Sequence, residues 1–314
     1  MTKSLTSNKD LSYDARAKMR PHPIPYQGSK RKLADLILDQ LPGHFRRFYE
    51  PFAGSAALTI AAASTKKADE FHFSDSCSPL IAIWHEILKR PDSIADGYEQ
   101  LWHAQLQDPR GFYNVTREEF NETGRPELFL YLLARCVKGS VRFNREGGFN
   151  QSPDNRRRGM HPSLMRRHIS ETAHLLGTAR VRCTDYEVAI QSATAQDFVY
   201  LDPPWMGVSE GPHRRYHERL DFDRFVLALK DLVNRRVPFA LSFDGSCGTR
   251  QYGRPLPKEL GLEQIALFAG RSTQATLLGR NEETVESLYL SPAVETRDSS
   301  LRGKSPRQGV LIPS

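Results

Sequence analysis

The chain has 314 residues, of which 39% are hydrophobic and 26% charged, and its formal net charge is +7. A chain of this length is too long to fold around one small hydrophobic core, and it suits a main domain with an additional lobe. Residues 1–20 lack the apolar segment of a secretory signal, and no apolar run approaches the roughly 18 residues of a membrane span, so the sequence predicts a cytoplasmic protein without membrane contact.

The first predicted elements indicate an α/β fold. Residues 1–20 are polar and aperiodic, which predicts a flexible N-terminal arm. Strands are expected at residues 46–52 and 70–75, and helices at residues 55–63 and 79–89. Because strands that alternate with helices are typical of parallel sheets, this half of the chain predicts a parallel sheet.

A second pattern begins near residue 92. Helices are expected at 127–137 and 162–176, with no convincing strand between residues 92 and 176. We therefore predict an inserted, mainly helical lobe in a discontinuous Rossmann-like domain. Later strands are expected at 179–183, 198–201, 239–243, 262–267 and 284–290, with a helix at 222–234. The predicted units are the arm (1–20), a catalytic domain (21–92 and 178–292), the lobe (93–177) and a disordered tail (293–314).

A glycine turn and a later acid suggest a nucleoside-binding site. Gly54 lies where the first strand turns into a helix, and Asp75 ends the next strand. Glycine permits close approach to the backbone, the helix N-terminus offers N–H groups to an anion, and an acid at that second position suits ribose hydroxyls. The absence of GxGxxG disfavours NAD and FAD, so S-adenosylmethionine fits better. Alone, the two residues also fit a helix cap and a surface acid.

The sequence "DPPW" follows the predicted strand 198–201. The Asp202 carboxylate and the Pro203 carbonyl can accept hydrogen bonds from an exocyclic amine, Pro204 stiffens the turn, and Trp205 offers a face for an extruded base. A strand-ending turn with a packed tryptophan is the simpler alternative. Asp185, also just past a strand, could accept from an adenine amino group while Tyr186 packs on the ring, although taken alone this acid is more often explained as a turn aspartate.

The lobe contains an arginine-rich segment suited to nucleic acid. In "VRFNREGGFN" (141–150), cationic side chains suit phosphates, asparagines suit base edges, and the aromatic ring could act as a wedge. Arg166 and Arg167 would extend the phosphate track. A solvated basic surface is the alternative for any single arginine. The predicted DNA-binding residues are Arg142, Phe143, Asn144, Arg145, Asn150, Arg156, Arg157 and Arg158.

These motifs together resemble the Dam-like, α-class (D12-type) DNA adenine N6-methyltransferases over about residues 24 to 292. "YQGSK" (26–30), "EPFAGSAAL" (50–58), "SDSCSPLI" (74–81), "CTDY" (183–186) and "DPPW" occur in the α-class order. Ala56, Phe143 and Trp205 depart from the family's second glycine and two tyrosines. The resemblance implies an S-adenosylmethionine pocket formed by Tyr26, Gly28, Lys30, Glu50, Pro51, Phe52, Gly54, Asp75, Asp185, Tyr186 and Asp202.

The resemblance implies site-specific methylation of a flipped adenine in duplex DNA, inside a prokaryotic cell or a phage-infected host. An RNA adenine methyltransferase, a DNA N4-cytosine methyltransferase and an inactive DNA-binding module are the alternatives. Asp rather than Ser at position 202 favours adenine, and intact Gly54 and Asp75 argue against an inactive module. We expect no metal, because the histidines and the four cysteines form no ligand set. A cognate restriction endonuclease, the recognition sequence and the oligomeric state are not determined by these motifs.

Overall fold

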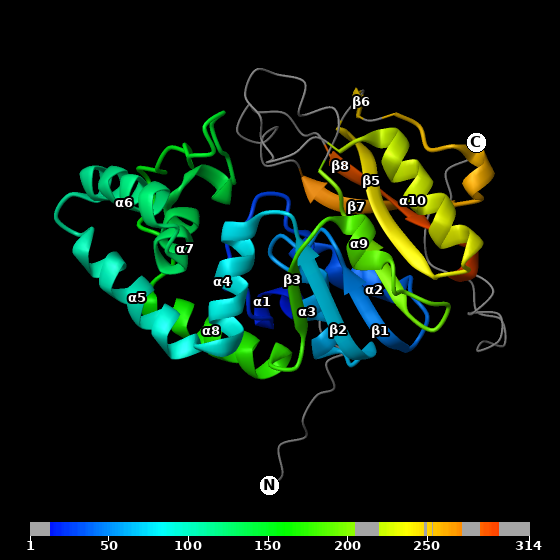
Figure 1. Cartoon of the computed structure of the whole chain (residues 1–314), viewed down its shortest axis with the longest axis horizontal. Coiled ribbons are helices and arrows are strands. Elements are labelled where there is room, and N and C mark those ends of the chain that lie inside the picture. Colours follow the sequence, from blue (N-terminus) through cyan, green and yellow to red (C-terminus); the bar gives the residue numbers. More distant parts are fainter. Residues whose placement is uncertain (1–12, 205–219, 248–249, 253, 272–282, 295–314) are drawn as a thin grey trace, which may run out of the picture.

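The computed structural model describes residues 13–204, 220–247, 250–252, 254–271 and 283–294. At its centre is a sheet with the strand order β3-β2-β1-β4-β5-β8-β7, and β6 pairs with β5 (Figure 1). The strands are β1 (Phe45–Glu50), β2 (Ala68–Asp75), β3 (Arg180–Cys183), β4 (Phe198–Leu201), β5 (Phe239–Cys247), β6 (Arg250–Tyr252), β7 (Glu263–Arg271) and β8 (Glu283–Leu290).

The sheet is mixed rather than wholly parallel. Strands β3, β2, β1, β4 and β5 are parallel, as predicted. The parallel arrangement predicted from the N-terminal half does not extend to the C-terminal strands, because β8 is antiparallel to both β5 and β7. Only residues 272–282 separate β7 from β8, fewer than the dozen or more that a parallel crossover requires.

Strand β4 shows how the sheet is buried on both faces. Phe198 and Tyr200 pack in a cluster with the helices α2 (Ala34–Asp39) and α3 (Ala57–Ser64). Val199 and Leu201 belong to the opposite cluster, which contains α9 (Tyr186–Ile190) and α10 (Phe222–Asn234). Because side chains alternate along a strand, the uninterrupted apolar run of β4 supplies both faces. The acid that follows it is thereby held at the end of a rigid central strand.

The predicted helical lobe is present and shares a core with the sheet domain. Trp84 and Ile87 of α4 belong to the same apolar cluster as Phe129 and Met165 of the lobe. Figure 1 shows α5, α6 and α7 on the side of the sheet away from α9 and α10. The first two of these helices were not predicted individually. The helices are α4 (Ser78–Lys89), α5 (Pro91–Ala104), α6 (Pro109–Thr123), α7 (Pro126–Arg135) and α8 (Pro162–Leu176).

The prediction of a flexible arm over residues 1–20 is wrong for residues 13–20. Tyr13–Met19 form the helix α1, and the Arg20 guanidinium donates to both oxygens of Asp35 at 2.7 and 2.6 Å. Both side chains of this pair are buried, and Arg16 lies 3.5 Å from the same carboxylate. The polar composition suggested a flexible arm, but its arginines attach this segment to α2 through ion pairs. Residues 1–12 and 295–314 lie outside the described residues.

No helix in the described part of the chain has the length and apolarity needed to cross a membrane.

Candidate active site

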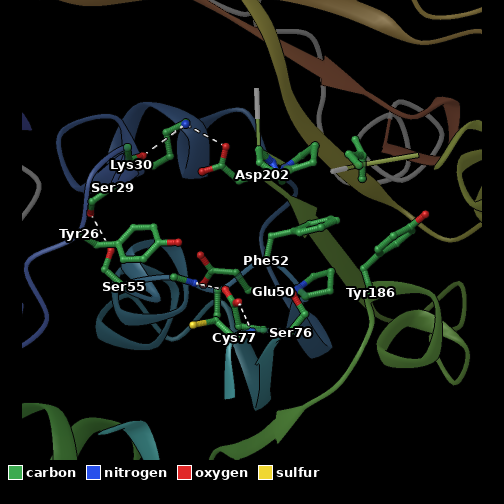
Figure 2. A pocket seen from close by; sticks show the side chains of 18 of the residues that line it. Tyr26, Ser29, Lys30, Glu50, Phe52, Ser55, Ser76, Cys77, Tyr186 and Asp202 are labelled. Atoms are coloured by element: carbon green, nitrogen blue, oxygen red, sulfur yellow. Dashed lines mark hydrogen bonds and ion pairs between the residues drawn. The ribbon is translucent and has the colours of Figure 1, made fainter. Parts of the chain in front are cut away.

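Acidic side chains follow the carboxyl ends of neighbouring parallel strands. Glu50 ends β1, Asp75 ends β2, Asp185 follows β3, and Asp202 follows β4. The strand order reverses between β1 and β4, and such a reversal is where open α/β sheets bind ligands. A cavity of about 370 Å³ lies at this edge and is lined by all four acids (Figure 2).

The cavity collects every residue that the sequence predicted for the cofactor, together with both prolines of "DPPW". Trp205 lies outside the described residues. These predicted residues come from four loops that follow different strands and from the segment 26–30. The lining residues among them are Tyr26, Gly28, Lys30, Glu50, Pro51, Phe52, Gly54, Asp75, Asp185, Tyr186, Asp202, Pro203 and Pro204.

The glycine turn is fixed on both sides by hydrogen bonds. The Gly54 N–H donates to the Asp75 carboxylate at 2.9 Å, and its carbonyl accepts from the Trp84 indole at 3.0 Å. Gly54 has a φ of +50°, and a Cβ there would lie 2.8 Å from a ring carbon of Tyr26. The turn therefore requires glycine. Asp75 accepts the N–H of Gly54, so this backbone group is already engaged within the protein.

Ala56 stands where the family motif has its second glycine, and it adopts a backbone conformation that glycine favours. Its φ is 48° and its ψ is 37°, in the left-handed region that favours glycine. An alanine there costs about 1 kcal/mol relative to an unstrained backbone. The side chain is fully buried, so packing offsets part of this cost. The turn thus retains its conformation although the sequence departs from the family pattern.

Glu50 occupies the N-terminus of α3. Its buried carboxyl group accepts hydrogen bonds from the backbone N–H of Thr59 at 2.7 Å and from the Thr59 hydroxyl. The carboxylate expected at this helix terminus is therefore the protein's own side chain, which corrects the prediction of a ligand group there. Burial raises the pKa of Glu50 to about 8, although the hydrogen bonds from Thr59 oppose this shift.

Asp202 lies against the buried ammonium of Lys30. The Lys30 Nζ atom is 2.9 Å from Asp202 Oδ1 and 3.5 Å from Glu286 Oε2 (Figure 2 draws the first pair). The same nitrogen donates to the Gly28 carbonyl at 3.5 Å. Burial raises the pKa of Asp202 to about 6; Lys30 opposes the shift, and Glu286 adds to it. Asp202 is thus a carboxylate at neutral pH.

Aromatic rings form another wall of the cavity. The rings of Phe52 and Tyr186 are stacked with centroids 5.1 Å apart, side by side in Figure 2. Arg224 of α10 lies over the Tyr186 ring at 5.5 Å and 3.0 Å from Asp185. Asp185 also accepts from the N–H of Glu187 at 2.9 Å and begins α9. Asp185 therefore both caps a helix and lines the cavity, so the two interpretations of this residue are compatible.

Several lining residues were missed from the sequence. Ser29 and Ser55 share a hydrogen bond of 2.8 Å across the cavity wall, and their positions inside two predicted motifs were the available signal. Glu286 had no such signal, because it comes from an antiparallel strand whose pairing the sequence did not reveal. The missed lining residues include Gln27, Ser29, Ser55, Cys77, Leu220, Asp221, Arg224 and Glu286.

The predicted recognition segment forms a tight loop on the lobe. The Asn144 N–H donates to the Gly148 carbonyl at 2.8 Å, and the Gly148 N–H donates back to Asn144 Oδ1 at 2.7 Å. The half-buried Phe143 packs against Phe129 and Phe149, with ring centroids 6.2 and 5.8 Å apart. In this conformation the predicted wedge contributes to the lobe's core.

The predicted phosphate-binding arginines differ in their surroundings. Arg145 and Arg158 are exposed, and Arg142 is half-buried. Arg156 and Arg157 are exposed and lie 3.2 and 3.7 Å from Asp154. The prediction that Arg166 extends the phosphate track is not supported, because its guanidinium is paired with two acids of α5, Asp96 and Glu99.

The segment 26–30, which was predicted to bind the cofactor, is hydrogen-bonded to the lobe just before the loop 141–150. The Gln27 N–H donates to the Gly139 carbonyl at 3.0 Å, and the Ser140 hydroxyl donates to the Gln27 side chain. Gly139 has a φ of +62°, and a Cβ there would lie 2.9 Å from the Pro25 backbone. The predicted cofactor segment thus contacts the lobe backbone two residues before the predicted DNA-binding loop 141–150.

Comparison with known proteins decides the family. Residues 26–244 match the model of the D12 class of N6 adenine-specific DNA methyltransferases. The chain belongs to this family. The D12 methyltransferase fold and the adenine-specific DNA methyltransferase activity expected from the motifs are thereby confirmed, and the RNA, cytosine and inactive alternatives are disfavoured.

Relatives of this D12 methyltransferase come from bacteria, an archaeon and a phage. The Type II methyltransferase M1.LlaDCHI of Lactococcus lactis subsp. cremoris is 26% identical over 84% of this chain and 94% of its own. The DNA adenine methylase of Serratia marcescens is 27% identical over 82% and 94%. The Type II methyltransferase M.MjaIII of Methanocaldococcus jannaschii is 23% identical over 64% and 74%.

Proposed function

We propose that this D12 methyltransferase transfers a methyl group from S-adenosylmethionine to N6 of an adenine extruded from duplex DNA. The observation that carries the proposal is the single cavity at the strand-order reversal, which brings the "DPP" turn and the predicted cofactor residues together. The catalytic domain would comprise residues 21–92 and 178–292, and the recognition lobe residues 93–177.

The cavity suits a nucleoside ligand with a cationic amino-acid end. Its volume of about 370 Å³ lies in the usual range for small-molecule sites. Phe52 and Tyr186 offer an apolar wall for a purine, and we assign Asp75, which lines the same cavity, to the ribose hydroxyls. Six carboxyl side chains line the cavity against the cations of Lys30 and Arg224, which favours a positively charged ligand. When bound, S-adenosylmethionine supplies the electrophilic methyl group on its sulfonium.

The residues after β4 then orient the nucleophile. Lys30 engages Asp202 Oδ1 and leaves Oδ2 for an N–H of the adenine amino group. The Pro203 carbonyl accepts the second N–H, and Pro204 stiffens the turn, because both prolines have fixed φ angles. Two acceptors draw N6 toward tetrahedral geometry and free its lone pair. Formation of the new N–C bond would break the S–CH3 bond of the sulfonium, with S-adenosylhomocysteine as the leaving group, and the N6 proton would pass to the Asp202 carboxylate. We assign Trp205 as the stacking face for the base.

The affinity for S-adenosylmethionine is expected to rise between about pH 6 and pH 8. Glu50, with a pKa raised to about 8, is mostly protonated in the empty cavity at pH 7, and Asp202, with a pKa near 6, is protonated below that value. A bound cation favours both carboxylates, so its binding releases protons, and higher pH favours it until Glu50 is already ionised. Calorimetry in buffers of different ionisation enthalpy measures this proton release.

S-adenosylhomocysteine provides the matched control for this pH dependence. It has the same adenosine and amino-acid groups but no sulfonium charge, so its affinity should change less over the same pH range. Equal pH dependence of the two ligands would contradict a role for these carboxyl groups in holding the sulfonium.

We further propose that the loop 141–150 and the adjacent arginines contact duplex DNA. Asn144 and Asn150 are exposed, as are Arg145 and Arg158, which suits base-edge and phosphate contacts. Arg142, Arg156 and Arg157 would complete the phosphate contacts. Phe143 would act as a wedge only after leaving its aromatic neighbours. The backbone contact between Gln27 and Gly139 places this loop beside the cofactor segment.

Arg145→Ala is expected to weaken DNA binding in a salt-dependent way. Loss of one phosphate contact should reduce the slope of log affinity against log salt by about 0.9. Fluorescence anisotropy with a labelled duplex at several salt concentrations measures the slope. Arg166→Ala is the matched control, because Asp96 and Glu99 already pair with that guanidinium, and its slope should stay at the wild-type value. An unchanged slope in Arg145→Ala would remove this residue from the DNA contacts.

We infer that methylation is site-specific and that the chain acts in the cytoplasm of a prokaryotic or phage-infected cell. Two relatives are named Type II methyltransferases, which supports a restriction–modification context with a cognate endonuclease. Expression in a host followed by digestion of its DNA with restriction enzymes tests this proposal. Complete protection at one short sequence supports it, and methylation without sequence preference contradicts it.

A further inference from the structure

The Lys30 ammonium is buried and contacts acceptors from several parts of the chain, including one that the sequence did not predict. Its side chain is 7% exposed, and the acceptors near Nζ include Asp202 Oδ1 at 2.9 Å, Glu286 Oε2 at 3.5 Å and the Gly28 carbonyl at 3.5 Å. An ammonium has three N–H groups, so it can engage several acceptors at once. One of them, Glu286, belongs to β8 and to none of the sequence motifs.

We propose that Glu286 is a positioning residue for methyl transfer, which fixes the Lys30 ammonium against Asp202 from the antiparallel side of the sheet. This inference rests on the proposed role of Asp202 as acceptor for the adenine amino group. Glu286 is placed for this role by its strand, because β8 pairs with β5, which in turn pairs with β4 just before Asp202. Its side chain is 18% exposed and lines the same cavity.

The geometry also predicts how Glu286 affects the Asp202 carboxylate through Lys30. Without its second carboxylate, Lys30 would keep Asp202 and Gly28 as partners but lose the contact that aligns it from β8. A flexible ammonium would let the Asp202 carboxylate rotate, and small displacements of a reacting group are costly to rate. The effect should therefore fall on the turnover number, while the S-adenosylmethionine affinity, set largely by other residues of the cavity, changes less.

The charges that face Asp202 give the proposal a distinctive pH signature. The charged groups are Lys30 before α2 and Glu286 on β8, and the other titratable groups are Glu50 on β1 and the Tyr200 hydroxyl on β4. Lys30 lowers the pKa of Asp202, whereas Glu286 raises it. Removing the charge of Glu286 should therefore move the acid limb of the kcat–pH profile to lower pH. Removing the charge of Lys30 should move it to higher pH.

The test compares Glu286→Gln, which keeps the shape of the side chain, with wild type, Lys30→Gln and Asp202→Asn. Methyl transfer from tritiated S-adenosylmethionine to long unmethylated duplex DNA is measured from pH 5 to pH 9. Glu286→Gln is expected to lower the plateau kcat by about tenfold, less than direct loss of a proton acceptor costs. Its acid limb should shift to lower pH, and that of Lys30→Gln to higher pH. Glu259→Gln, an exposed carboxylate paired with Lys230, is the matched control and should behave as wild type.

The outcomes separate this inference from the proposed function. A fully active Asp202→Asn variant overturns the proposed role of Asp202. An inactive Asp202→Asn together with an unshifted acid limb in Glu286→Gln overturns only the inference about Glu286. A fall in melting temperature and activity of Glu286→Gln without any pH shift indicates a purely structural role and equally overturns it. Glu286→Asp, which restores the charge, should return the acid limb toward the wild-type position.

Discussion

Asp202→Ala is expected to reduce methyl transfer by about 10³-fold or more while S-adenosylmethionine still binds. The substitution removes the acceptor that orients N6 and takes its proton, and such groups contribute about 10²–10⁴-fold to rate. The cofactor should lose only the electrostatic contribution of the Asp202 carboxylate, because the aromatic wall, Asp75 and Glu50 are unchanged. Lys30 keeps Glu286 at 3.5 Å, so the variant leaves no isolated buried cation.

Single-turnover transfer of a tritiated methyl group measures the rate of Asp202→Ala, and calorimetry measures its affinity for the cofactor. Asp202→Asn is the matched variant, because it keeps the shape but not the charge, and it should be nearly as impaired. Transfer by Asp202→Ala at the wild-type rate would contradict the proposed mechanism.

Asp75→Ala is expected to impair both cofactor binding and stability. The carboxylate accepts the N–H of Gly54 at 2.9 Å and the N–H of Cys77 at 3.0 Å, and thus joins two loops of the cavity. An N–H left without an acceptor in a buried position costs about 1–3 kcal/mol. Loss of the proposed ribose contact should weaken S-adenosylmethionine binding by about tenfold or more. Loss of the hydrogen bond from Gly54 should also make the glycine turn less ordered.

Thermal unfolding and calorimetry separate the two effects of Asp75→Ala. Asp75→Asn retains one acceptor oxygen and should recover part of the melting temperature while its affinity for the cofactor stays low. If Asp75→Ala binds S-adenosylmethionine as tightly as wild type, the assignment of this acid to the ribose is wrong.

The sequence predicted the parallel half of the fold well because its signals are local. The apolar run of β4, the alanine-rich α3 and the acid after each strand depend on neighbours in the chain. The limits of β4, α8 and α10 agree with their predicted ranges. The antiparallel pairing of β7 and β8 was missed because strand direction depends on partners far along the sequence. Helix α1 was missed because it is anchored by polar contacts with α2, above all those of Arg16 and Arg20 with Asp35.

The candidate site shows the same division. Residue types inside motifs, such as Gly54 and Asp75, were predicted, but their hydrogen bonds to each other were not. The helix terminus that seemed free for a ligand is capped by Glu50, which only the three-dimensional arrangement reveals. Glu286 and Arg224 reach the cavity from β8 and α10, where no short motif marked them. Chemistry carried by one loop is thus readable from sequence, whereas chemistry assembled across the sheet is not.

The central claim is tested most directly by the identity of the methylated nucleoside. The purified protein is incubated with tritiated S-adenosylmethionine and unmethylated duplex DNA, single-stranded DNA or RNA, and each product is digested to nucleosides and separated. The proposed function predicts label in N6-methyladenine from duplex DNA, with little label in the other substrates. Label in N4-methylcytosine, or in RNA alone, would contradict it.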